Sequence, residues 1–520
     1  METLDLRPLA ALMEKALKQE IKRLCRRAGR RNNGRDAKAR QDRQKFEKRT
    51  GLKAGLPKPA SSLAKVHRHF DPTHCARNAN IIAKTIWKKV LDATYEPVPA
   101  VRYQIPKPQG GVREIMAFAI PDAALANVVL RRARDRNIKR LSPFSYAYHP
   151  ERDVFDAILA LKGFMTDQRL FAVQIDFQKY FDTIPTRYME RCIDDRELVA
   201  VTPHERFVLK EFMRHQFASV SDYLIGDFAR RHIGTPQGSS VSLLLANLAN
   251  HELDRSLERK SGRFVRYADD VVALCSTYAE AEELEETFIE HCQNSGLIIN
   301  EKKSPGIAII GKDEAEIRSY SGFDYLGYRF TKGGLKIPDH VRARIIAKMS
   351  RLIQVYLIQY PKKFGFNKNR CRTVRKPYDW DLLGLVLELR GYLYGGLEEE
   401  EITKFLNGGD KLREMRGLMG FYALLEDAET LKELDRWLLV SLRLAMRKRQ
   451  RILKIKYKRK GLSPSAEELI LGQWLDKRAW RGPNCPNPRL PSFVRGWRAA
   501  RKYYYTFGLE GVEPPPYSYY

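Results

Sequence analysis

The sequence lacks any long uncharged apolar run, and this absence argues against a membrane-spanning protein. None of its apolar stretches approaches the roughly 18 residues that a transmembrane helix needs. The N-terminus, METLDLRPLAALMEKALKQE, also lacks the basic start, long apolar stretch and small-residue cleavage site of a secretory signal. We therefore expect a cytoplasmic protein, with no membrane among its partners.

Cysteine is scarce and scattered along the chain. No two of the seven cysteines are spaced as Cys-x-x-Cys. This excludes the usual spacing of a zinc site and gives no support to a disulfide framework. Reduced, ordinary cysteines are the expectation.

Acidic residues are too few to balance the basic ones. The chain of 520 residues has 93 Lys and Arg against 63 Asp and Glu, a formal net charge of +30. An excess of this size favours a polyanionic partner, which is either nucleic acid or an anionic membrane surface. Without membrane signals, nucleic acid is the better expectation.

Much of the basic excess lies near the N-terminus. The stretch KRLCRRAGRRNNGRDAKARQDRQKFEKR covers residues 22–49. It is either a solvated tail or an arm that becomes ordered on the phosphates of RNA or DNA. The following GLKAGLPKPASS, residues 51–62, is typical of a linker.

Apolar patterning predicts an alternation of strands and helices after residue 100. A run such as FAVQI is typical of a buried strand, and an acidic start favours a helix. Strands are predicted at 103–115 (two, joined at a Gly-Gly turn), 171–175, 263–274 (two, joined by a tight turn), 296–300 and 324–330. Helices are predicted at 81–91, 121–136, 278–293 and 431–453.

Three aspartates follow strands in this pattern. Asp176 ends the strand 171–175, and Asp269 and Asp270 occupy the turn of the pair 263–274. If the first strand runs beside that pair, three carboxylates converge. Such a like-charge cluster is costly without a cation, and carboxylate oxygens suit Mg²⁺ or Mn²⁺. Two such ions about 3.5–4 Å apart support phosphoryl transfer.

At this point the sequence resembles bacterial reverse transcriptases related to group II intron proteins, most like those associated with anti-phage defence. The matching blocks occur in the family's order from about residue 103 to 450. They are IPKPQGGVREI (105–115), SPFSYAYHPERDVFDAI (142–158), QIDFQKYFDTI (174–184), GTPQGSSVSLLLANLANHELD (234–254), RYADDVV (266–272), GLIINEKKS (296–304), FDYLGYRF (323–330), and MRGLMGFYALL with LDRWLLVSLRLAMRKRQ (415–450). One departure is Leu243, where the family usually has Pro.

The resemblance implies an α/β (α+β) right-hand polymerase fold, with an antiparallel sheet in fingers and palm and a helical thumb. The expected divisions are a basic, helical, RNA-binding N-terminal extension (1–95), fingers (96–170), palm (171–335) with an inserted fingers segment at about 186–232, thumb (336–455) and a Tyr/Pro-rich C-terminal extension (456–520).

The resemblance also implies roles for individual residues. Asp176, Asp269 and Asp270, with the backbone carbonyl of Phe177, would hold two Mg²⁺ ions, with Mn²⁺ as an alternative. Asp269 is favoured over Asp270 as the ligand shared by both ions, because neighbouring residues do not face the same way. Lys303 matches the lysine that protonates pyrophosphate, although Lys302 is adjacent.

Further roles follow for substrate binding. Phe181 would pack against the sugar and reject a 2′-hydroxyl, which favours DNA synthesis over RNA synthesis; plain core packing is the alternative. Asp182 is expected to be structural. The residues implied in nucleotide binding are Lys107, Arg113, Phe181, Gln237 and Gly238, and those implied near primer and template are Tyr267, Ala268, Leu326 and Gly327.

The implied enzyme is an RNA-directed DNA polymerase that uses dNTPs, an RNA template and a DNA product. The segment after residue 450 has one cysteine, Cys485, and no paired metal-ligand pattern, unlike many intron proteins. We therefore favour a defence enzyme copying a dedicated structured non-coding RNA, with a homo-oligomer as a further expectation. An intron-encoded reverse transcriptase/maturase or another retroelement polymerase is the alternative. Tyr519 and Tyr520 raise a further hypothesis, that a terminal hydroxyl primes DNA synthesis.

Overall fold

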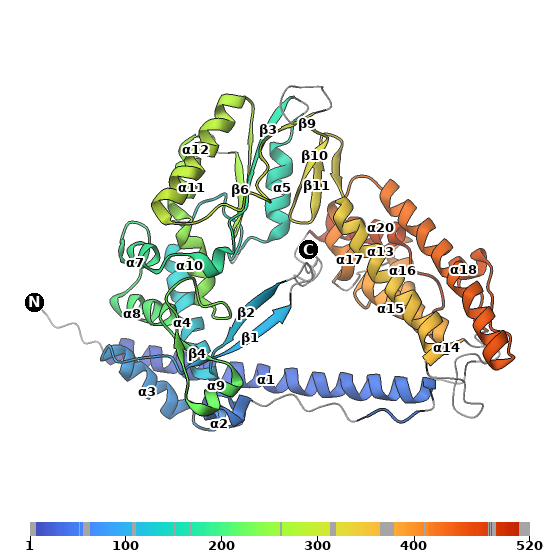
Figure 1. Ribbon diagram of the computed structural model, residues 1–520, viewed down its shortest axis with the longest axis horizontal. Coiled ribbons are helices and arrows are strands. Elements are labelled where there is room, and N and C mark those ends of the chain that lie inside the picture. Colours follow the sequence, from blue (N-terminus) through green and yellow to red (C-terminus); the bar gives the residue numbers. More distant parts are fainter. Residues whose placement is uncertain are drawn as a thin grey trace, which may run out of the picture. The chain divides into compact units, whose positions relative to one another are not determined.

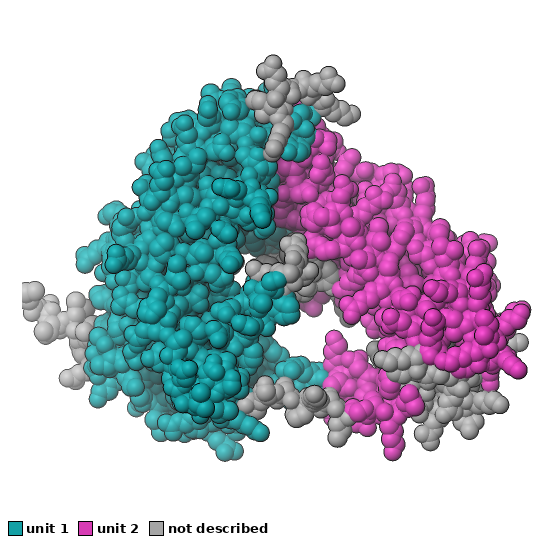
Figure 2. Space-filling view, in the orientation of Figure 1, with its two compact units in different colours: residues 1–36, 58–320 teal, residues 37–57, 321–520 magenta. Residues whose placement is uncertain are grey.

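The chain divides into two compact units (Figure 2), of which, in the residues described, the first contains two β-sheets and the second contains one. One contains Met1–Asp36 and Lys58–Tyr320, and the other contains Ala37–Pro57 and Ser321–Tyr520. The computed structural model describes residues 7–50, 52–55, 63–106, 111–149, 151–166, 168–260, 263–311, 319–363, 379–409, 412, 414–476, 478, 480 and 485–508.

The N-terminal stretch is helical, and its basic residues beyond Cys25 are mostly exposed, so both interpretations of its role stay open. Helix α1 (Arg7–Thr50) is the longest in Figure 1. Its first half repeats apolar residues every fourth position, which places them on one helical face. This face is buried in the core of the first unit through Met13, Leu17, Ile21 and Cys25. Of the predicted linker, residues 52–55 are described, and they form neither helix nor strand.

A buried carboxylate anchors α1 to helix α4 (Ile120–Asn137). Glu20 Oε1 accepts a hydrogen bond from Asn127 (2.8 Å), and Oε2 accepts one from Arg131 (2.9 Å). Burial alone would raise the pKa of Glu20, but hydrogen bonds from Arg23, Asn127 and Arg131 lower it to about 2. The carboxylate is therefore satisfied at neutral pH, as a buried charge must be.

The central sheet of the first unit has the strand order β6-β7-β3-β8-β9. Its middle strand, β3 (Leu170–Ile175), is almost wholly buried, which fits its continuous apolar sequence. Helix α12 (Tyr278–Ser295) packs on β3, β7 and β8. The other strands are β6 (Phe264–Tyr267), β7 (Asp270–Cys275), β8 (Gly306–Ile310) and β9 (Ser319–Tyr320).

A second sheet in the same unit has the order β2-β1-β4-β5. The predicted pair at 103–115 is its antiparallel hairpin, with Ile105 opposite Arg113. Its strands are β1 (Ala100–Pro106), β2 (Val112–Ala117), β4 (Gln216–Ala218) and β5 (Ala229–Arg230).

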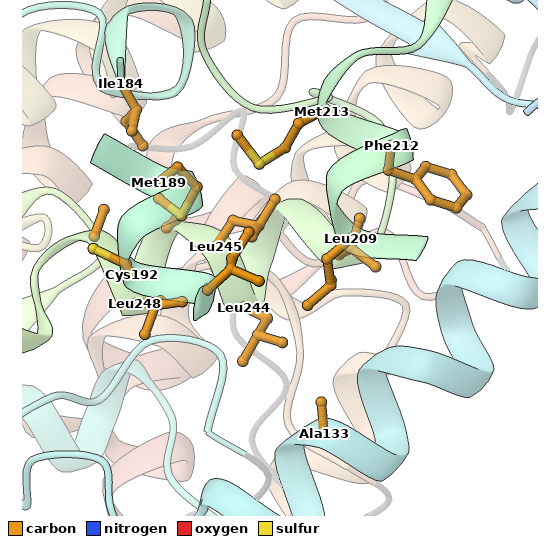
Figure 3. Packing of buried hydrophobic residues seen from close by; sticks show 14 of the residues in the cluster. Ala133, Ile184, Met189, Cys192, Leu209, Phe212, Met213, Leu244, Leu245 and Leu248 are labelled. Atoms are coloured by element: carbon orange, nitrogen blue, oxygen red, sulfur yellow. The ribbon is translucent and has the colours of Figure 1, made fainter. Parts of the chain in front are cut away.

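Helices from distant parts of the sequence share one apolar core in the first unit (Figure 3). Met189 and Cys192 come from α7, Leu209 from α8, and Leu244 and Leu245 from α10. This packing fixes α10, which precedes the strand pair that carries two of the three aspartates. The helices of this unit after α1 are α2 (Pro72–Arg77), α3 (Ala79–Leu91), α4, α5 (Val154–Phe164), α6 (Tyr180–Thr183), α7 (Thr186–Asp194), α8 (Pro203–Met213), α9 (Val220–Ile225), α10 (Val241–Ala249), α11 (His251–Lys260) and α12.

The second unit begins with a three-stranded antiparallel sheet and continues as helices. Its core includes Arg449, a buried arginine that bonds to Asp379 and Asp381. Its elements are β10 (Gly322–Tyr325), β11 (Tyr328–Thr331), β12 (Gly334–Lys336), α13 (Asp339–Ile353), a π-helix (Gln354–Gln359), α14 (Tyr360–Lys363), α15 (Trp380–Tyr394), α16 (Glu399–Leu406), α17 (Gly417–Phe421), α18 (Glu429–Tyr457), α19 (Ala466–Leu471) and α20 (Phe493–Phe507).

The predicted fold class, mixed α/β with antiparallel sheets, is confirmed, but two predicted strands are wrong. Residues 296–300 form no regular strand, and only Ile299 makes an isolated bridge, to Phe177. Residues 324–330 are not one strand but a hairpin that turns at Leu326 and Gly327. In the described part of the chain, no helix is long and apolar enough to cross a membrane.

Candidate active site

The register of β3 on β7 brings the three aspartates together. The two strands are antiparallel, with Ile175 opposite Val271. Asp176, the next residue, therefore lies beside Asp270, and its carboxyl group helps to raise the pKa of Asp270. Asp269 precedes Asp270 in the β6–β7 turn, where Tyr267 pairs with Asp270.

Asp176 is held by the loop that follows α12. Its Oδ2 accepts a hydrogen bond from Asn300 Nδ2 (2.8 Å), and Asn300 N donates to its backbone carbonyl (2.8 Å). Its own N–H donates to Ser304 Oγ (3.1 Å). The segment predicted as a strand at 296–300 thus serves as a brace for the first aspartate.

Burial and the neighbouring carboxyl groups raise the pKa values of Asp269 and Asp270. Burial, then Asp269 and then Asp176, raise the pKa of Asp270 well above its ordinary value. Burial and Asp176 raise the pKa of Asp269, while Lys303 and Arg113 lower it. Like charges this close are costly in a low-dielectric site, and a divalent cation would relieve the repulsion.

The donor set fits a hard cation such as Mg²⁺, since it consists of carboxylates. Within the residues that the structure describes, however, no three His, Cys, Asp or Glu side chains are arranged to hold a metal ion. Metal binding by the aspartates is therefore a proposal. Phe177 has a buried ring that packs on Tyr180 (centroids 5.5 Å apart), so only its backbone is available to a ligand.

Of the two adjacent lysines, Lys303 is the one that reaches the aspartates. Its Nζ lies 3.3 Å from Asp176 Oδ2, and its side chain is 64% exposed. Lys303 N donates to Asn300 O (2.9 Å), so the same loop positions the lysine and braces Asp176. A surface lysine beside a carboxylate is accessible to an incoming phosphate.

The loop of Gln237 and Gly238 is fixed against β2. Gln237 O accepts from Met116 N (2.8 Å), and a Cβ on Gly238, whose φ is +110°, would lie 2.1 Å from Met116 O. Gly238 therefore permits close approach of the loop to its own sheet. Gln237 Nε2 donates to Asp182 Oδ1 (2.8 Å), which gives Asp182 the structural role expected of it.

The backbone of Phe181 is fixed by hydrogen bonds from Thr235. Its carbonyl accepts hydrogen bonds from Thr235 N (2.7 Å) and Thr235 Oγ1 (3.2 Å). Its ring is half-buried and lies edge-on to Tyr180, with centroids 5.6 Å apart. The ring is packed against the core but is not enclosed by it, so both interpretations of its role stay open.

Other predicted residues have different outcomes. Arg113 is exposed on β2 and acts electrostatically on Asp269. Lys107, Tyr519 and Tyr520 lie outside the described residues. Leu326 and Gly327 form the β10–β11 turn of the second unit, with positive φ of 47° and 80°, and their place near primer and template stays a prediction.

The sequence reasoning missed Arg266, which is fully buried in β6 beneath the turn of the aspartates. It bonds to both carboxylate oxygens of Asp254 and to the carbonyl of Ala268. The available signal was a cation next to the apolar Val265 within the predicted strand pair 263–274. Tyr267 and Ala268 lie in that same hairpin.

The sheet, the acid trio and the bracing loop can now be compared with known proteins. Residues 105–330 match the family described as Reverse transcriptase (RNA-dependent DNA polymerase). This range is less than half of the chain, and it includes the three aspartates, Lys303 and Gln237.

Two curated proteins are similar to part of the chain. Protein YkfC of Escherichia coli is 27% identical over 176 residues, 33% of this chain and 44% of that protein. The COX1/OXI3 intron 2 protein of Saccharomyces cerevisiae is 26% identical over 165 residues, 31% of this chain and 18% of that protein. The chain thus spans less than half the length of these relatives.

Solved structures of telomerase are also similar, though weakly. Apo telomerase from Candida tropicalis has a TM-score of 0.37 and 14% identity, covering 70% of this chain and 68% of that one. Telomerase from Candida albicans in complex with a telomeric RNA fragment has a TM-score of 0.36 and 11% identity, covering 70% and 63%. At scores this low, the fold assignment rests on the sheets and helices described above.

Proposed function

We propose that this chain is an RNA-directed DNA polymerase that adds deoxynucleotides to a primer 3′-hydroxyl. The observation that carries the proposal is the convergence of Asp176, Asp269 and Asp270 within the residues that match the reverse transcriptase family. These carboxylates, with the Phe177 carbonyl, would hold two Mg²⁺ ions, with Mn²⁺ as an alternative. When bound, the ions would neutralise the charge that develops in phosphoryl transfer.

The other residues of the site would act on the nucleotide. Lys303 would donate a proton to the leaving pyrophosphate, and its exposed amino group beside Asp176 supports this role. Arg113 would contact the triphosphate, because a guanidinium binds phosphate oxygens bidentately. Gln237, with its Nε2 held by Asp182, would present Oε1 to the nucleotide or template.

A competition between dNTPs and rNTPs tests the kind of polymer made. The wild-type chain is expected to prefer dNTPs on a primed RNA template. Phe181→Ala should raise rNTP incorporation relative to dNTP by about 10-fold or more, within the range of a pocket contact. Phe228→Ala, a change at a partly exposed ring on another segment of the first unit, is the matched control and should leave the ratio unchanged. A wild-type preference for rNTPs would overturn the proposal.

We further propose that α1 binds the phosphates of the template RNA. Lys18, Lys22, Arg26 and Arg30 follow one another at every fourth position, so they form a ridge along one side of the helix. The last three are exposed. The apolar face of this part of α1 is buried in the core, so it has no face left for insertion into a lipid surface.

The salt dependence of RNA binding tests the ridge. Replacing Lys22, Arg26 and Arg30 by Gln should lower the slope of log affinity against log salt by about 2, at roughly 0.7 per phosphate contact on single strands. A triple change to Gln of exposed cations on other segments, Lys139, Arg187 and Arg196, removes the same charge. Equal loss of slope in the two variants would contradict a specific role for α1.

The biological role is a finer proposal. We propose that the enzyme copies a dedicated non-coding RNA in bacterial anti-phage defence, acting in the cytoplasm; the resemblance of its sequence blocks to defence-associated reverse transcriptases supports this. The alternative, an intron-encoded reverse transcriptase/maturase, is favoured by the similarity to the COX1/OXI3 intron 2 protein. Sequencing the RNA and DNA that co-purify from the host distinguishes them: a discrete non-intron RNA supports defence, and intron RNA overturns it.

A further inference from the structure

Arg266 is a buried cation whose place in the core needs an explanation. Its side chain is fully buried, as is that of its partner Asp254 on α11 (0% and 1% exposed). Nε and Nη2 donate to the two oxygens of Asp254, both at 2.6 Å. An apolar pair of similar volume is often as stabilising as a buried ion pair, so stability alone does not account for the pair.

The third nitrogen of Arg266 reaches the turn that carries the aspartates. Nη1 donates to the carbonyl of Ala268 (2.9 Å) and to Asn247 Oδ1 (3.2 Å). Asn247 is itself fixed, because its Nδ2 donates to Ala147 O (2.9 Å). The guanidinium therefore connects three separate elements, α10, α11 and the β6–β7 turn.

The turn needs such a support because its first central residue is strained. Ala268 has a φ of +63°, a conformation that costs a non-glycine residue about 1–2 kcal/mol. Two-residue hairpins with positive φ at this position usually have glycine there. Strain of this kind persists where the surroundings over-determine the backbone, and the Arg266 bond to the Ala268 carbonyl does so.

Fixing that carbonyl also fixes Asp269. The Ala268 carbonyl and the Asp269 N–H belong to one planar peptide unit, so the orientation of one sets the other. The Asp269 carboxylate accepts a hydrogen bond from its own N–H. A guanidinium bond on one end of the peptide and a carboxylate bond on the other thus form a continuous chain from the core to the site.

We infer that Arg266, held by Asp254, is a positioning residue that orients the Ala268–Asp269 peptide and thereby aims the Asp269 carboxylate. It touches neither substrate nor metal, and it acts through the turn. The inference rests on the proposed polymerase function, because the orientation of the Asp269 carboxylate affects catalysis only if Asp269 takes part in the reaction. A misplacement of about 1 Å at a reacting centre lowers rates by about 100-fold.

The main test replaces the ion pair by an apolar pair. Asp254→Leu combined with Arg266→Met should keep the fold, with a melting temperature within about 5 °C of the wild type. It should lower kcat for primer extension about 100-fold, while the KM for dNTP changes less than about 3-fold. A double variant that is folded and has wild-type kcat would overturn the inference.

A second variant covers the case in which the double variant does not fold. Arg266→Lys keeps the charge, but an ammonium group cannot reproduce the hydrogen bonds that the guanidinium makes to Asp254, Asn247 and Ala268 together. Its matched control is Arg449→Lys in the second unit, where an equally buried arginine bonds to Asp379 and Asp381. Both should lose stability, but only Arg266→Lys should lose kcat below its melting temperature. Equal kcat in these two variants would overturn the positioning role.

Binding of Mn²⁺ gives a readout that does not depend on polymerase activity. Titration of the free-ion EPR signal should show affinity about 10-fold weaker in the Arg266 variants, as for other residues that orient metal ligands. If the wild type binds Mn²⁺ but copies no template, the proposed function fails. The positioning role of Arg266 can still be tested in that case, by comparing the Mn²⁺ affinity of the wild type with that of the Arg266 variants. Unchanged Mn²⁺ affinity in folded Arg266 variants would contradict it.

Discussion

Asp176 and Asp270 lie side by side across the β3–β7 pair, since Ile175 pairs with Val271. Burial and the neighbouring carboxyl groups of Asp269 and Asp176 raise the pKa of Asp270, whereas metal binding requires its carboxyl group to be deprotonated. A dication would relieve the repulsion among the three aspartates. This relationship leads directly to the first prediction.

Divalent metal should stabilise the wild-type chain against heat. A ligand that binds only the folded state adds about 2.7 kcal/mol at 100 times its Kd. Mg²⁺ or Mn²⁺ should therefore raise Tm for the wild type but not for Asp176→Asn with Asp270→Asn. Scanning calorimetry with and without metal measures this. An equal metal-induced rise in both proteins would place the binding elsewhere.

Lys303 and Lys302 form a natural matched pair. Lys303→Gln should lower kcat about 100-fold, a typical contribution of a general acid. Lys302→Gln removes the same charge one residue away and should leave kcat within about 3-fold of the wild type. Single-turnover primer extension with both variants decides the matter; similar losses would remove Lys303 from its proposed role.

Gly238 should be far less replaceable than Gly111. Both have positive φ, but a Cβ at Gly238 would also meet Met116 O at 2.1 Å, whereas a Cβ at Gly111 would meet nothing within 4 Å. Gly111→Ala should cost about 1 kcal/mol of unfolding free energy from strain alone, and Gly238→Ala roughly 3 kcal/mol. Chemical denaturation compares them. Equal costs would mean that the loop of Gln237 can shift away from β2.

Asp122 should make the protein less stable as pH rises from about 4 to 7. Burial raises the pKa of Asp122 to about 7, despite hydrogen bonds from Tyr95 Oη (2.8 Å) and Val98 N (3.1 Å). The folded state then holds a proton that the unfolded state has lost, so its contribution is full below pH 3.8 and is lost as pH passes 7. Asp122→Asn should remove this part of the pH dependence. If the denaturation midpoint depends on pH in the same way for Asp122→Asn and the wild type, the folded protein does not hold the extra proton on Asp122 between about pH 4 and pH 7.

Much of the site follows from sequence because it depends on local pattern. The apolar run before Asp176 predicts β3, and the turn at Asp269–Asp270 predicts the hairpin. The sequence alone did not show that the first strand lies beside the hairpin. The structure shows that β3 pairs with β7 in an antiparallel register. The choice of Lys303 over Lys302 likewise depends on the direction of one loop.

Other features depend on tertiary contacts that leave little local signal. Residues 296–300 have an apolar composition typical of a strand, but hydrogen bonds to Asp176 hold them as a loop. Arg266 gives no indication of burial by itself, because its partner Asp254 lies 12 residues earlier on a helix. The helical character of the N-terminal extension was predicted, but the burial of Met13, Leu17, Ile21 and Cys25 in the core of the first unit was not.

The most direct test of the central claim is templated DNA synthesis by the wild type and by Asp269→Asn with Asp270→Asn. The assay uses full-length protein, a primed RNA template, dNTPs and Mg²⁺, with folding verified by thermal melting. The wild type should extend the primer with deoxynucleotides, and the folded double variant should lose that activity by at least about 1,000-fold. A folded double variant that extends the primer at the wild-type rate would contradict the assignment of the active site to these aspartates.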